Sequence, residues 1–315
     1  MCSKEELPKS LSDVSDIPKQ EMQEQPGVHH EMKPQPLVHH LPTDGEHLEE
    51  YHASGKLKSK IALITGGDSG IGRSVAALFS LEGCEGIAIV HLPREEKDAQ
   101  ETKRRIEKQS NTHVELICKD IGCEKNAIEI IDTVVKKWGR IDVLVNNASE
   151  QHLSGSIEDL SAEQLERTFR SNLYGMIFLS KHAIKHMKKG STIINTTSVT
   201  AYKGHQLLLD YSITKAGIVG FTRSLSLQLI SKGIRVNAVA PDISQSIVSF
   251  RPIWTPLIKA SFPPEMIDEF GKEVPFGRAG QPSEVAPCYV FLAGNDSSYM
   301  TGQVLHPNGG TIVNG

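Results

Sequence analysis

The stretch "KIALITGGDSGIGRSVAALF", residues 60–79, decides the fold because it joins a strand to a helix through a cluster of glycines. Residues 60–65 are mostly apolar without alternation, a pattern typical of a strand that is buried on both faces. After the glycines, four apolar residues follow the spacing of one helix face: Ile71, Val75, Leu78 and Phe79. The sequence therefore predicts a strand, a tight turn and a helix in that order.

The glycines in this turn, Gly66, Gly70 and Gly72, are spaced G-x3-G-x-G. Because glycine has no Cβ, its backbone turns tightly and approaches a ligand closely. The N-terminus of a helix attracts the negative charge of a phosphate, so a glycine turn at that point predicts a dinucleotide pyrophosphate site. A glycine-rich surface turn without a ligand is the alternative.

Short apolar runs and longer amphipathic stretches alternate along residues 57–315. The predicted strands are 60–65, 86–90, 113–118, 141–147, 191–198, 233–239 and 302–306, and the predicted helices are 95–109, 125–138, 161–188, 211–231 and 284–293. Such alternation favours a parallel sheet with helices on both faces. The expected fold is therefore a single α/β domain with a doubly wound, seven-stranded parallel sheet of the Rossmann type.

Residues 1–56 differ in composition from the rest of the chain. Proline, glutamine and histidine are frequent there and no helical or strand period is sustained, so we expect an extended or disordered arm. Six histidines lie in it: His29, His30, His39, His40, His47 and His52. A solvated arm is favoured over a metal site because no acid or cysteine completes a ligand set at a useful spacing. The stretch has no arginine and many carboxylates, unlike a transit peptide.

The overall composition excludes several classes of protein. The net charge is −4, hydrophobic residues make up 38% of the chain and charged residues 23%. This balance favours a soluble globular protein and gives no reason to expect nucleic acid or membrane as a partner. The five cysteines are scattered without CxxC spacing, which indicates reduced thiols in the cytoplasm and no metal site.

Five motifs in order resemble the short-chain dehydrogenase/reductase family. They are "TGGDSGIG" at 65–72, "NNAS" at 146–149, "RSN" at 170–172, Ser198, and "YSITK" at 211–215. The similarity spans nearly all of 57–315, and Ser198 lies thirteen residues before Tyr211. "NTTSVTAYKG", "PIWTPLI", the C-terminal stretch and the arm itself resemble the branch of glucose/ribitol dehydrogenase-like proteins and NADPH-dependent aldehyde reductases. Members usually pack as homodimers or homotetramers, so the resemblance implies such an assembly, in which the arm could bind a neighbouring subunit.

The resemblance also implies roles for individual residues. Ser69 and Ile71 would offer backbone donors near the phosphates, and Asp120 would meet the adenine. Asn146 would support the strand that borders the adenosine. The nicotinamide carboxamide would contact the backbone of Ile253 and the hydroxyl of Thr255.

The end of the second strand bears on the choice of cofactor. An acid at that point would bind the adenine-side ribose hydroxyls and repel a 2′-phosphate. His91 and Leu92 stand there instead, and the nearest cations are Arg94 and Arg73. The sequence therefore favours NADP, with Arg94 near the phosphate, and NAD is the alternative.

Tyr211 and Lys215 are four residues apart and so share one face of the predicted helix. A free phenol has a pKa near 10, and an adjacent ammonium together with the nicotinamide charge would lower it towards neutrality. Ser198 could donate to a substrate carbonyl, and the resemblance gives Asn172 a kinked helix that links Lys215 to solvent through a water. Tyr211 is therefore interpreted as the catalytic acid/base; a packed tyrosine beside a snorkelling lysine is the alternative.

The chain departs from the family pattern after "NAVAP" at 237–241. Roughly nine residues, within 242–251, separate this motif from "PIWTP", and the expected glycine is absent. The extra residues could loop outward, displace the carboxamide contacts, or come from unremoved intervening sequence.

The leading hypothesis is hydride transfer between NADP(H) and a small carbonyl or secondary alcohol, such as an aldehyde, sugar or polyol. The rival is a catalytically impaired dinucleotide-binding scaffold or sensor.

Overall fold

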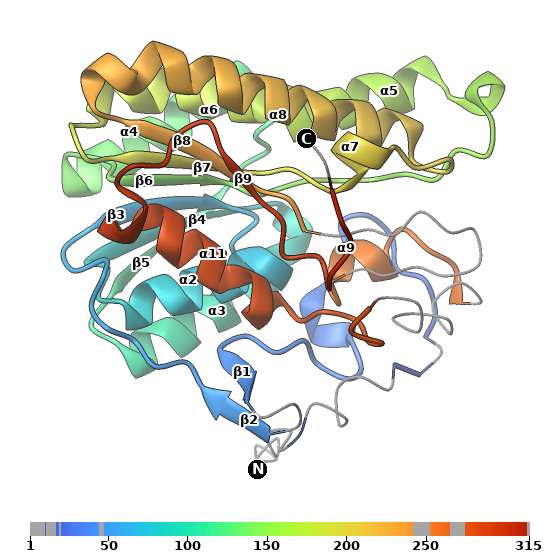
Figure 1. The fold of residues 1–315 in the computed structure, drawn as a ribbon, viewed down its shortest axis with the longest axis horizontal. Coiled ribbons are helices and arrows are strands. Elements are labelled where there is room, and N and C mark those ends of the chain that lie inside the picture. The colour runs from blue at the N-terminus through green and yellow to red at the C-terminus, as the bar shows by residue number, and fades with distance from the viewer. Residues whose placement is uncertain are drawn as a thin grey trace.

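The computed structural model describes residues 10, 17–18, 20–43, 47–241, 253–264 and 275–313. A seven-stranded sheet with the order β5-β4-β3-β6-β7-β8-β9 forms its centre (Figure 1). Every neighbouring pair in it is parallel. The strands are β3 Ile61–Thr65, β4 Gly86–His91, β5 His113–Cys118, β6 Val143–Asn146, β7 Thr192–Thr196, β8 Arg235–Val239 and β9 Val304–Leu305. The predicted α/β class and its seven-stranded parallel sheet are confirmed.

The strand order changes direction between β3 and β6. From β3 the chain adds β4 and β5 on one side, and then it crosses back to add β6, β7, β8 and β9 on the other. In open parallel sheets the loops at such a switch point diverge, and they leave a crevice at the carboxyl ends of the strands. The glycine turn follows β3 directly, so the fold places it in this crevice.

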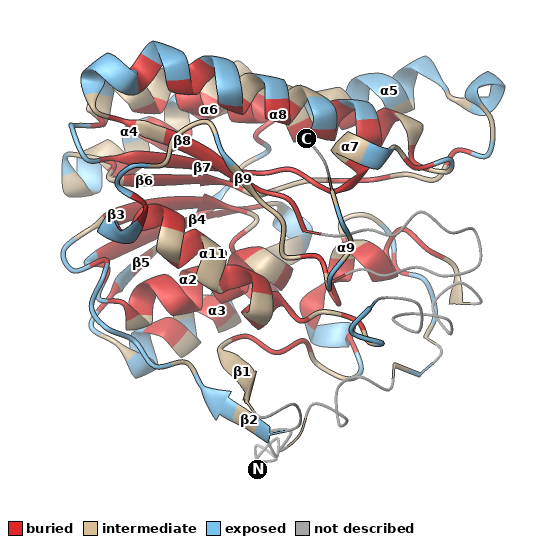
Figure 2. Cartoon of the chain, viewed as in Figure 1, coloured by how far each residue is buried: buried red, intermediate tan, exposed pale blue. Residues whose placement is uncertain are grey.

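Helices cover both faces of the sheet (Figure 1). On one face lie α2 Gly70–Leu81, α3 Glu96–Gln109 and α11 Pro282–Ala293, and on the other lie α4 Glu124–Trp138, α6 Gly175–Ala183 and α8 Leu209–Leu229. Each layer has its own apolar core against the sheet, with Phe79 and Tyr289 in the first and Ile130 and Leu179 in the second. Burial accordingly follows the inner helix faces and the strands (Figure 2).

The predicted helix over 161–188 is helical without a break over 162–186, but it is not one regular α-helix. It consists of α5 Ala162–Phe169, a π-helical turn Arg170–Tyr174, α6 and a 3-10 turn Ile184–His186. The π turn holds Asn172, whose side chain is fully bonded to neighbouring segments. Periodicity over a long window does not register one extra residue per turn, and π turns of this kind are frequent at functional sites.

Shorter helices complete the described chain. The α-helical turns are α7 Thr200–Lys203 and α9 Pro256–Lys259, and the 3-10 turns are His29–Glu31, Pro93–Glu95, Ile157–Asp159, Ile230–Lys232 and Asn295–Ser297. Within the described ranges, no helix combines the length and the apolar character that crossing a bilayer requires.

The described part of the N-terminal arm is largely extended, but it is not solvated as expected. Strands β1 His40–Thr43 and β2 His47–Glu50 pair antiparallel as a hairpin. Before the hairpin, His29 and Met32 are each only 1% exposed. The arm has too few apolar residues to form a core of its own, but they dock into a cluster with Trp254 and Phe262 of the domain. Stretches far apart in sequence thus supply the burial that composition alone does not reveal.

Candidate active site

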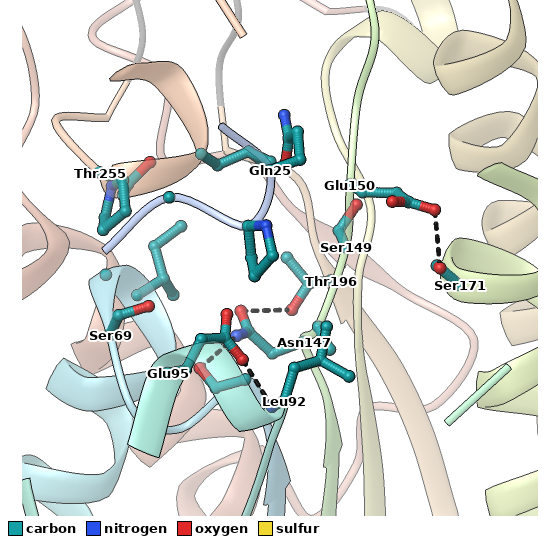
Figure 3. A pocket seen from close by; sticks show the side chains of 18 of the residues that line it. Gln25, Ser69, Leu92, Glu95, Asn147, Ser149, Glu150, Ser171, Thr196 and Thr255 are labelled. Atoms are coloured by element: carbon teal, nitrogen blue, oxygen red, sulfur yellow. Dashed lines mark hydrogen bonds between the residues drawn. The ribbon is translucent and has the colours of Figure 1, made fainter. Parts of the chain in front are cut away.

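One cavity opens at the carboxyl ends of the central strands, at the predicted switch point (Figure 3). Ten of the predicted site residues line it: Gly66, Ser69, Gly70, Ile71, Asp120, Ser198, Tyr211, Lys215, Ile253 and Thr255. The other four, Gly72, Arg94, Asn146 and Asn172, are not among its lining residues. The structure therefore brings together the glycine turn, the adenosine end and the catalytic set around a single space.

The glycine turn is built so that side chains cannot fill it. Gly66 and Gly70 have φ angles of +61° and +50°, which L side chains rarely adopt. A Cβ on Gly72 would lie 1.9 Å from the Gly66 carbonyl oxygen, so Gly72 holds the turn closed from behind the cavity. The first amides of α2 lie at this turn beside Ser69. The bare backbone and the helix N-terminus fit a pyrophosphate.

Asn146 and Asn147 support the turn from β6. Asn146 is fully buried and donates from Nδ2 to Asn195 Oδ1 at 2.9 Å, which ties β6 to β7. Asn147, which sequence reasoning did not single out, lines the cavity and donates to the Thr65 and Gly66 carbonyls at 3.2 and 3.3 Å. The pair fixes β6 and the glycine turn relative to each other.

The adenosine end of the cavity lies beside β4 and β5. Asp120 lines it, and its Oδ1 accepts a hydrogen bond from Gly122 N at 2.8 Å. Glu95 and Lys119 also line the cavity, and neither was predicted. Glu95 accepts from Leu92 N at 2.7 Å, and burial, followed by the charges of nearby carboxylates, raises its pKa to about 8. Burial therefore favours the protonated form of the carboxyl that lines this end.

The two arginines considered for a 2′-phosphate both have other partners. The Arg94 Nη1 lies 2.9 Å from Glu24 Oε2 of the arm. Arg73 is 2% exposed and pairs with Asp98, with Nη2 3.2 Å from Oδ1. Sequence distance from the strand end did not show these partners, because Glu24 lies 70 residues before Arg94. Lys119, which lines the same end of the cavity, is paired as well, with Nζ 2.6 Å from Glu129 Oε2.

The catalytic set comes from β7 and α8. Ser198 follows the end of β7, while Tyr211 and Lys215 lie on the first turns of α8. Lys215 Nζ donates to the Thr196 carbonyl at 3.0 Å and lies 5.2 Å from the centre of the Tyr211 ring. The buried carboxylate of Asp210 accepts from Tyr211 N at 2.8 Å and so stabilises the start of the helix.

Burial shifts the pKa values of Tyr211 and Lys215 in opposite directions. It raises the pKa of the Tyr211 phenol well above 10, although a hydrogen bond with Ser198 acts the other way. It lowers the pKa of Lys215 from 10.5 to about 7. The expected lowering of the phenol pKa involves the ammonium together with the nicotinamide charge. In the chain alone burial is the larger effect and the pKa is raised, so that expectation stays a prediction for the cofactor-bound state.

Asn172 stands behind the catalytic set. Its Oδ1 accepts from Ser149 Oγ and Glu150 N at 3.0 and 2.8 Å, and its Nδ2 donates to Glu150 O at 2.8 Å and Thr214 Oγ1 at 3.2 Å. This side chain therefore joins the cavity wall at 149–150 to the residue before Lys215. Its side chain bonds across segments while the backbone takes the π turn.

Glu150 is a lining residue that sequence reasoning did not find. Burial alone would raise its pKa, but hydrogen bonds from His152 and Ser171 and the charge of Arg167 lower it, so the group is a carboxylate. Figure 3 shows its bond to Ser171 across the cavity wall. Gln151, His152 and Tyr202 are not among the residues that line this cavity. The insertion at 242–251 lies outside the described residues.

Among the described residues, one group of three side chains could be brought onto a metal ion: His91, Glu96 and Cys118, whose donor atoms lie within 4.8 Å of one another. The histidines of the arm are not part of it. His91 and Cys118 are neighbours in the register of β4 and β5, a proximity that spacing along the chain does not reveal. The expectation that the protein holds no metal stays a prediction.

Comparison with known proteins gives consistent matches. The family model described as enoyl-(acyl carrier protein) reductase matches residues 66–311. A glucose and ribitol dehydrogenase from Daucus carota is 52% identical and covers 95% of this chain and 98% of its own length. The NADPH-dependent aldehyde reductase 1, chloroplastic, from Arabidopsis thaliana is 53% identical over 94% of this chain and 98% of its own length.

A solved structure matches the fold as well. The short-chain dehydrogenase from Burkholderia cenocepacia J2315 in complex with NADP superimposes with a TM-score of 0.72. It is 26% identical in sequence, and the match covers 81% of this chain and 98% of that one. The sequence comparison and the structural comparison thus agree on the kind of protein to which this chain is similar.

Proposed function

The chain belongs to the short-chain dehydrogenase/reductase family of NAD(P)-dependent oxidoreductases that act on CH–OH groups, and we propose that it transfers hydride between NADP(H) and a small carbonyl or secondary-alcohol substrate. The observation that carries the proposal is the convergence of the glycine turn with Ser198, Tyr211 and Lys215 on one cavity. An aldehyde, a sugar or a polyol is the substrate class.

In the proposed reaction the protein handles the proton. The dinucleotide supplies or accepts the hydride when it is bound. The Tyr211 phenol gives its proton to the carbonyl oxygen as that oxygen becomes a hydroxyl, and it takes the proton back in the oxidative direction. Ser198 donates a hydrogen bond to the same oxygen and stabilises its developing charge.

Lys215 and Asn172 have supporting roles in this proposal. The phenol pKa is high in the chain alone, so proton transfer near neutral pH requires additional positive charge beside Tyr211. A charged Lys215 and the oxidised nicotinamide ring would both act in that sense. Asn172 is a positioning residue, because it fixes the wall at 149–150 and bonds Thr214 beside the lysine.

The preference for NADP rests on the adenosine end. Lys119 lines that end and would exchange Glu129 for a 2′-phosphate, and the raised pKa of Glu95 weakens the negative charge that would repel one. One relative is named as NADPH-dependent, and a solved relative contains NADP. Arg94 precedes Glu95 in sequence, and its guanidinium already binds Glu24. In this proposal it therefore contributes less to phosphate binding than Lys119 does.

A hydroxylated substrate suits the polar groups near the catalytic set. The Glu150 carboxylate lines the cavity, and carboxylates accept hydrogen bonds from substrate hydroxyls. The names of the relatives include glucose, ribitol and aldehyde.

The decisive test compares two tyrosines. Tyr211→Phe should lower kcat by about 10²–10⁴-fold, the usual contribution of a general acid, while NADPH still binds. Tyr289→Phe is the matched control, because Tyr289 is also fully buried and its hydroxyl bonds Thr196 Oγ1 at 2.7 Å. The control should lose stability of about 1 kcal/mol and keep most of its turnover. Equal turnover in both variants would remove Tyr211 from its role.

The scaffold alternative, a folded binder without chemistry, is tested with the unmodified protein. NADPH absorbance is followed with a panel of small aldehydes, sugars and polyols, and turnover of any of them rejects it. Assembly into dimers or tetramers and a cytoplasmic location stay proposals. The mass of the protein in solution tests whether it assembles. The same measurement on a protein without the arm tests whether assembly depends on the arm, whose described part docks on its own domain.

A further inference from the structure

The N-terminal arm crosses the mouth of the active-site cavity. Gln25, Pro26 and Gly27 are lining residues, although they lie far before the glycine turn in sequence. Figure 3 shows this segment as the pale blue ribbon that runs between Thr255 and Ser149, above the catalytic cavity. We call residues 23–35 the strap. It forms a wall that the seven-stranded domain alone does not supply.

One side of the strap is fixed to the phosphate-binding end. His29, 1% exposed, accepts a hydrogen bond at Nδ1 from Gly70 N at 3.3 Å. Burial and the charge of Arg73 hold the His29 pKa well below 6.5, so the ring is neutral and can accept. The backbone amides of His29 and His30 donate to the Asp98 carboxylate at 2.7 and 3.1 Å. The first backbone amides of a helix have no partner within the helix. The strap binds one of them, Gly70 N, and leaves the following amides of α2 for a ligand.

The other side of the strap is fixed to residues 253–262, which line the opposite wall. The Gln25 Nε2 donates to Gln151 O at 2.8 Å and to Ser261 Oγ at 2.9 Å. Gln23 N donates to Lys259 O at 3.0 Å, and Trp254 Nε1 donates to Pro34 O at 2.9 Å. These bonds come from both ends of the strap and hold segment 253–262 in place.

The strap also touches the catalytic residue's surroundings. Met32 packs in one buried cluster with Tyr211, Trp254, Ile258 and Phe262. At Gly27 the two segments are so close that a Cβ would lie 2.3 Å from the Pro256 carbonyl oxygen. The approach is backbone to backbone, so even one methyl group would force the strap and α9 apart.

With the strap in place, the cavity encloses about 190 Å³. Gln25, Pro26 and Gly27 form part of the wall of this space, together with the glycine turn and Thr255.

We propose that the strap is an integral wall of the dinucleotide site, in which Gln25 and Gly27 are positioning residues that hold segment 253–262 over the bound cofactor and so set its affinity. The proposal rests on the proposed function only in the identity of the ligand as NADP(H). It replaces the earlier expectation of a solvated arm with a role inside the active site. The strap therefore contributes to the binding of the cofactor and takes no direct part in the transfer of hydride or proton.

The test uses the full-length protein and NADPH as the probe. Gly27→Ala should raise the Kd for NADPH by about fivefold or more, the equivalent of losing one or two hydrogen bonds. Gly155→Ala is the control, because Gly155 is exposed and its Cβ would meet nothing within 4 Å. Gln25→Ala removes three side-chain hydrogen bonds, to Gln151 O, Ala260 O and Ser261 Oγ, without a clash and should act in the same direction.

Fluorescence titration gives the Kd, and thermal unfolding without NADPH shows whether each variant is folded. A raised Kd and a raised KM for NADPH with kcat held within twofold support a positioning role. If Gly27→Ala and Gln25→Ala both unfold normally and both bind NADPH as tightly as Gly155→Ala, the proposal is wrong. Binding is measured without turnover, so failure of the strap proposal is separate from failure of the reductase assignment.

Discussion

A methyl group on Gly72 is the sharpest perturbation of the phosphate-binding turn. In Gly72→Ala the new carbon would lie 1.9 Å from the Gly66 carbonyl oxygen and 2.7 Å from Asn147 Nδ2. Non-bonded carbon atoms prefer separations of about 3.5–4.0 Å, so the turn must open by more than about 1 Å. The Gly66 oxygen belongs to the backbone and cannot rotate away, which means that the turn itself moves.

The expected magnitude follows from this displacement. A misplacement of about 1 Å costs about a hundredfold in rate, or about 2.7 kcal/mol of transition-state stabilisation. We therefore expect kcat/KM for NADPH to fall by about a hundredfold or more. Gly66→Ala should give a smaller loss, because its Cβ would lie 3.1 Å from Ala148 Cα and its φ of +61° adds about 1–2 kcal/mol of strain.

Gly220→Ala is the matched control on helix α8. Gly220 is exposed and a Cβ there would meet nothing within 4 Å, so alanine should stabilise the helix by about 0.5–1 kcal/mol and leave kcat/KM unchanged. The assay is initial-rate kinetics over a range of NADPH concentrations, with circular dichroism to confirm folding. If folded Gly72→Ala keeps kcat/KM within threefold of the control, the close-approach account of the turn is refuted.

Three further predictions concern titration, cofactor choice and support of the site. The folded pKa of Lys215, about 7, lies below its ordinary 10.5, so between these pH values the unfolded chain holds a proton that the folded chain lacks. The free energy of unfolding of the cofactor-free protein should therefore rise from pH 7 to pH 9, and Lys215→Met should flatten that rise in urea titrations; parallel slopes would contradict it. Lys119→Ala should raise the KM for NADPH at least fivefold and leave the KM for NADH within twofold, a loss of one charge contact of about 1 kcal/mol or more; equal effects on both would argue against a phosphate role. Asn172→Ala leaves buried partners such as Glu150 N unpaired and should cost about 1–3 kcal/mol in chemical unfolding, with a fall in kcat; unchanged stability would show that the network is dispensable.

Local sequence was sufficient for the fold and for the catalytic motif. Apolar strands, amphipathic helices and a glycine turn are encoded by residues within a few positions of one another, and so residues 60–79 predict their own structure. The alternation along the chain then leaves a parallel, doubly wound sheet as the consistent arrangement. The spacing of Tyr211 and Lys215 likewise places both on one helix face without further information.

Interactions between distant stretches were not accessible in this way. His29 meets Gly70, Glu24 meets Arg94, and Gln25 meets Ser261, each pair separated by at least 41 residues. Composition described the arm as unable to form a core, which holds only for the arm by itself. Docking depends on the shape of a surface that other segments create, and no periodicity in the arm records it.

The charge states of the site were also decided by tertiary structure. Spacing places Lys215 next to the Tyr211 phenol, but it does not show that both groups are buried, which in the chain alone raises the phenol pKa and lowers that of the lysine. A pKa depends on how much water the fold removes and on which charges remain nearby, and these are properties of the assembled cavity. Sequence therefore determined which chemical groups are present and in what order along the chain, whereas the packing of the strap, the cavity wall and α8 decided their neighbours, their solvation and hence their protonation.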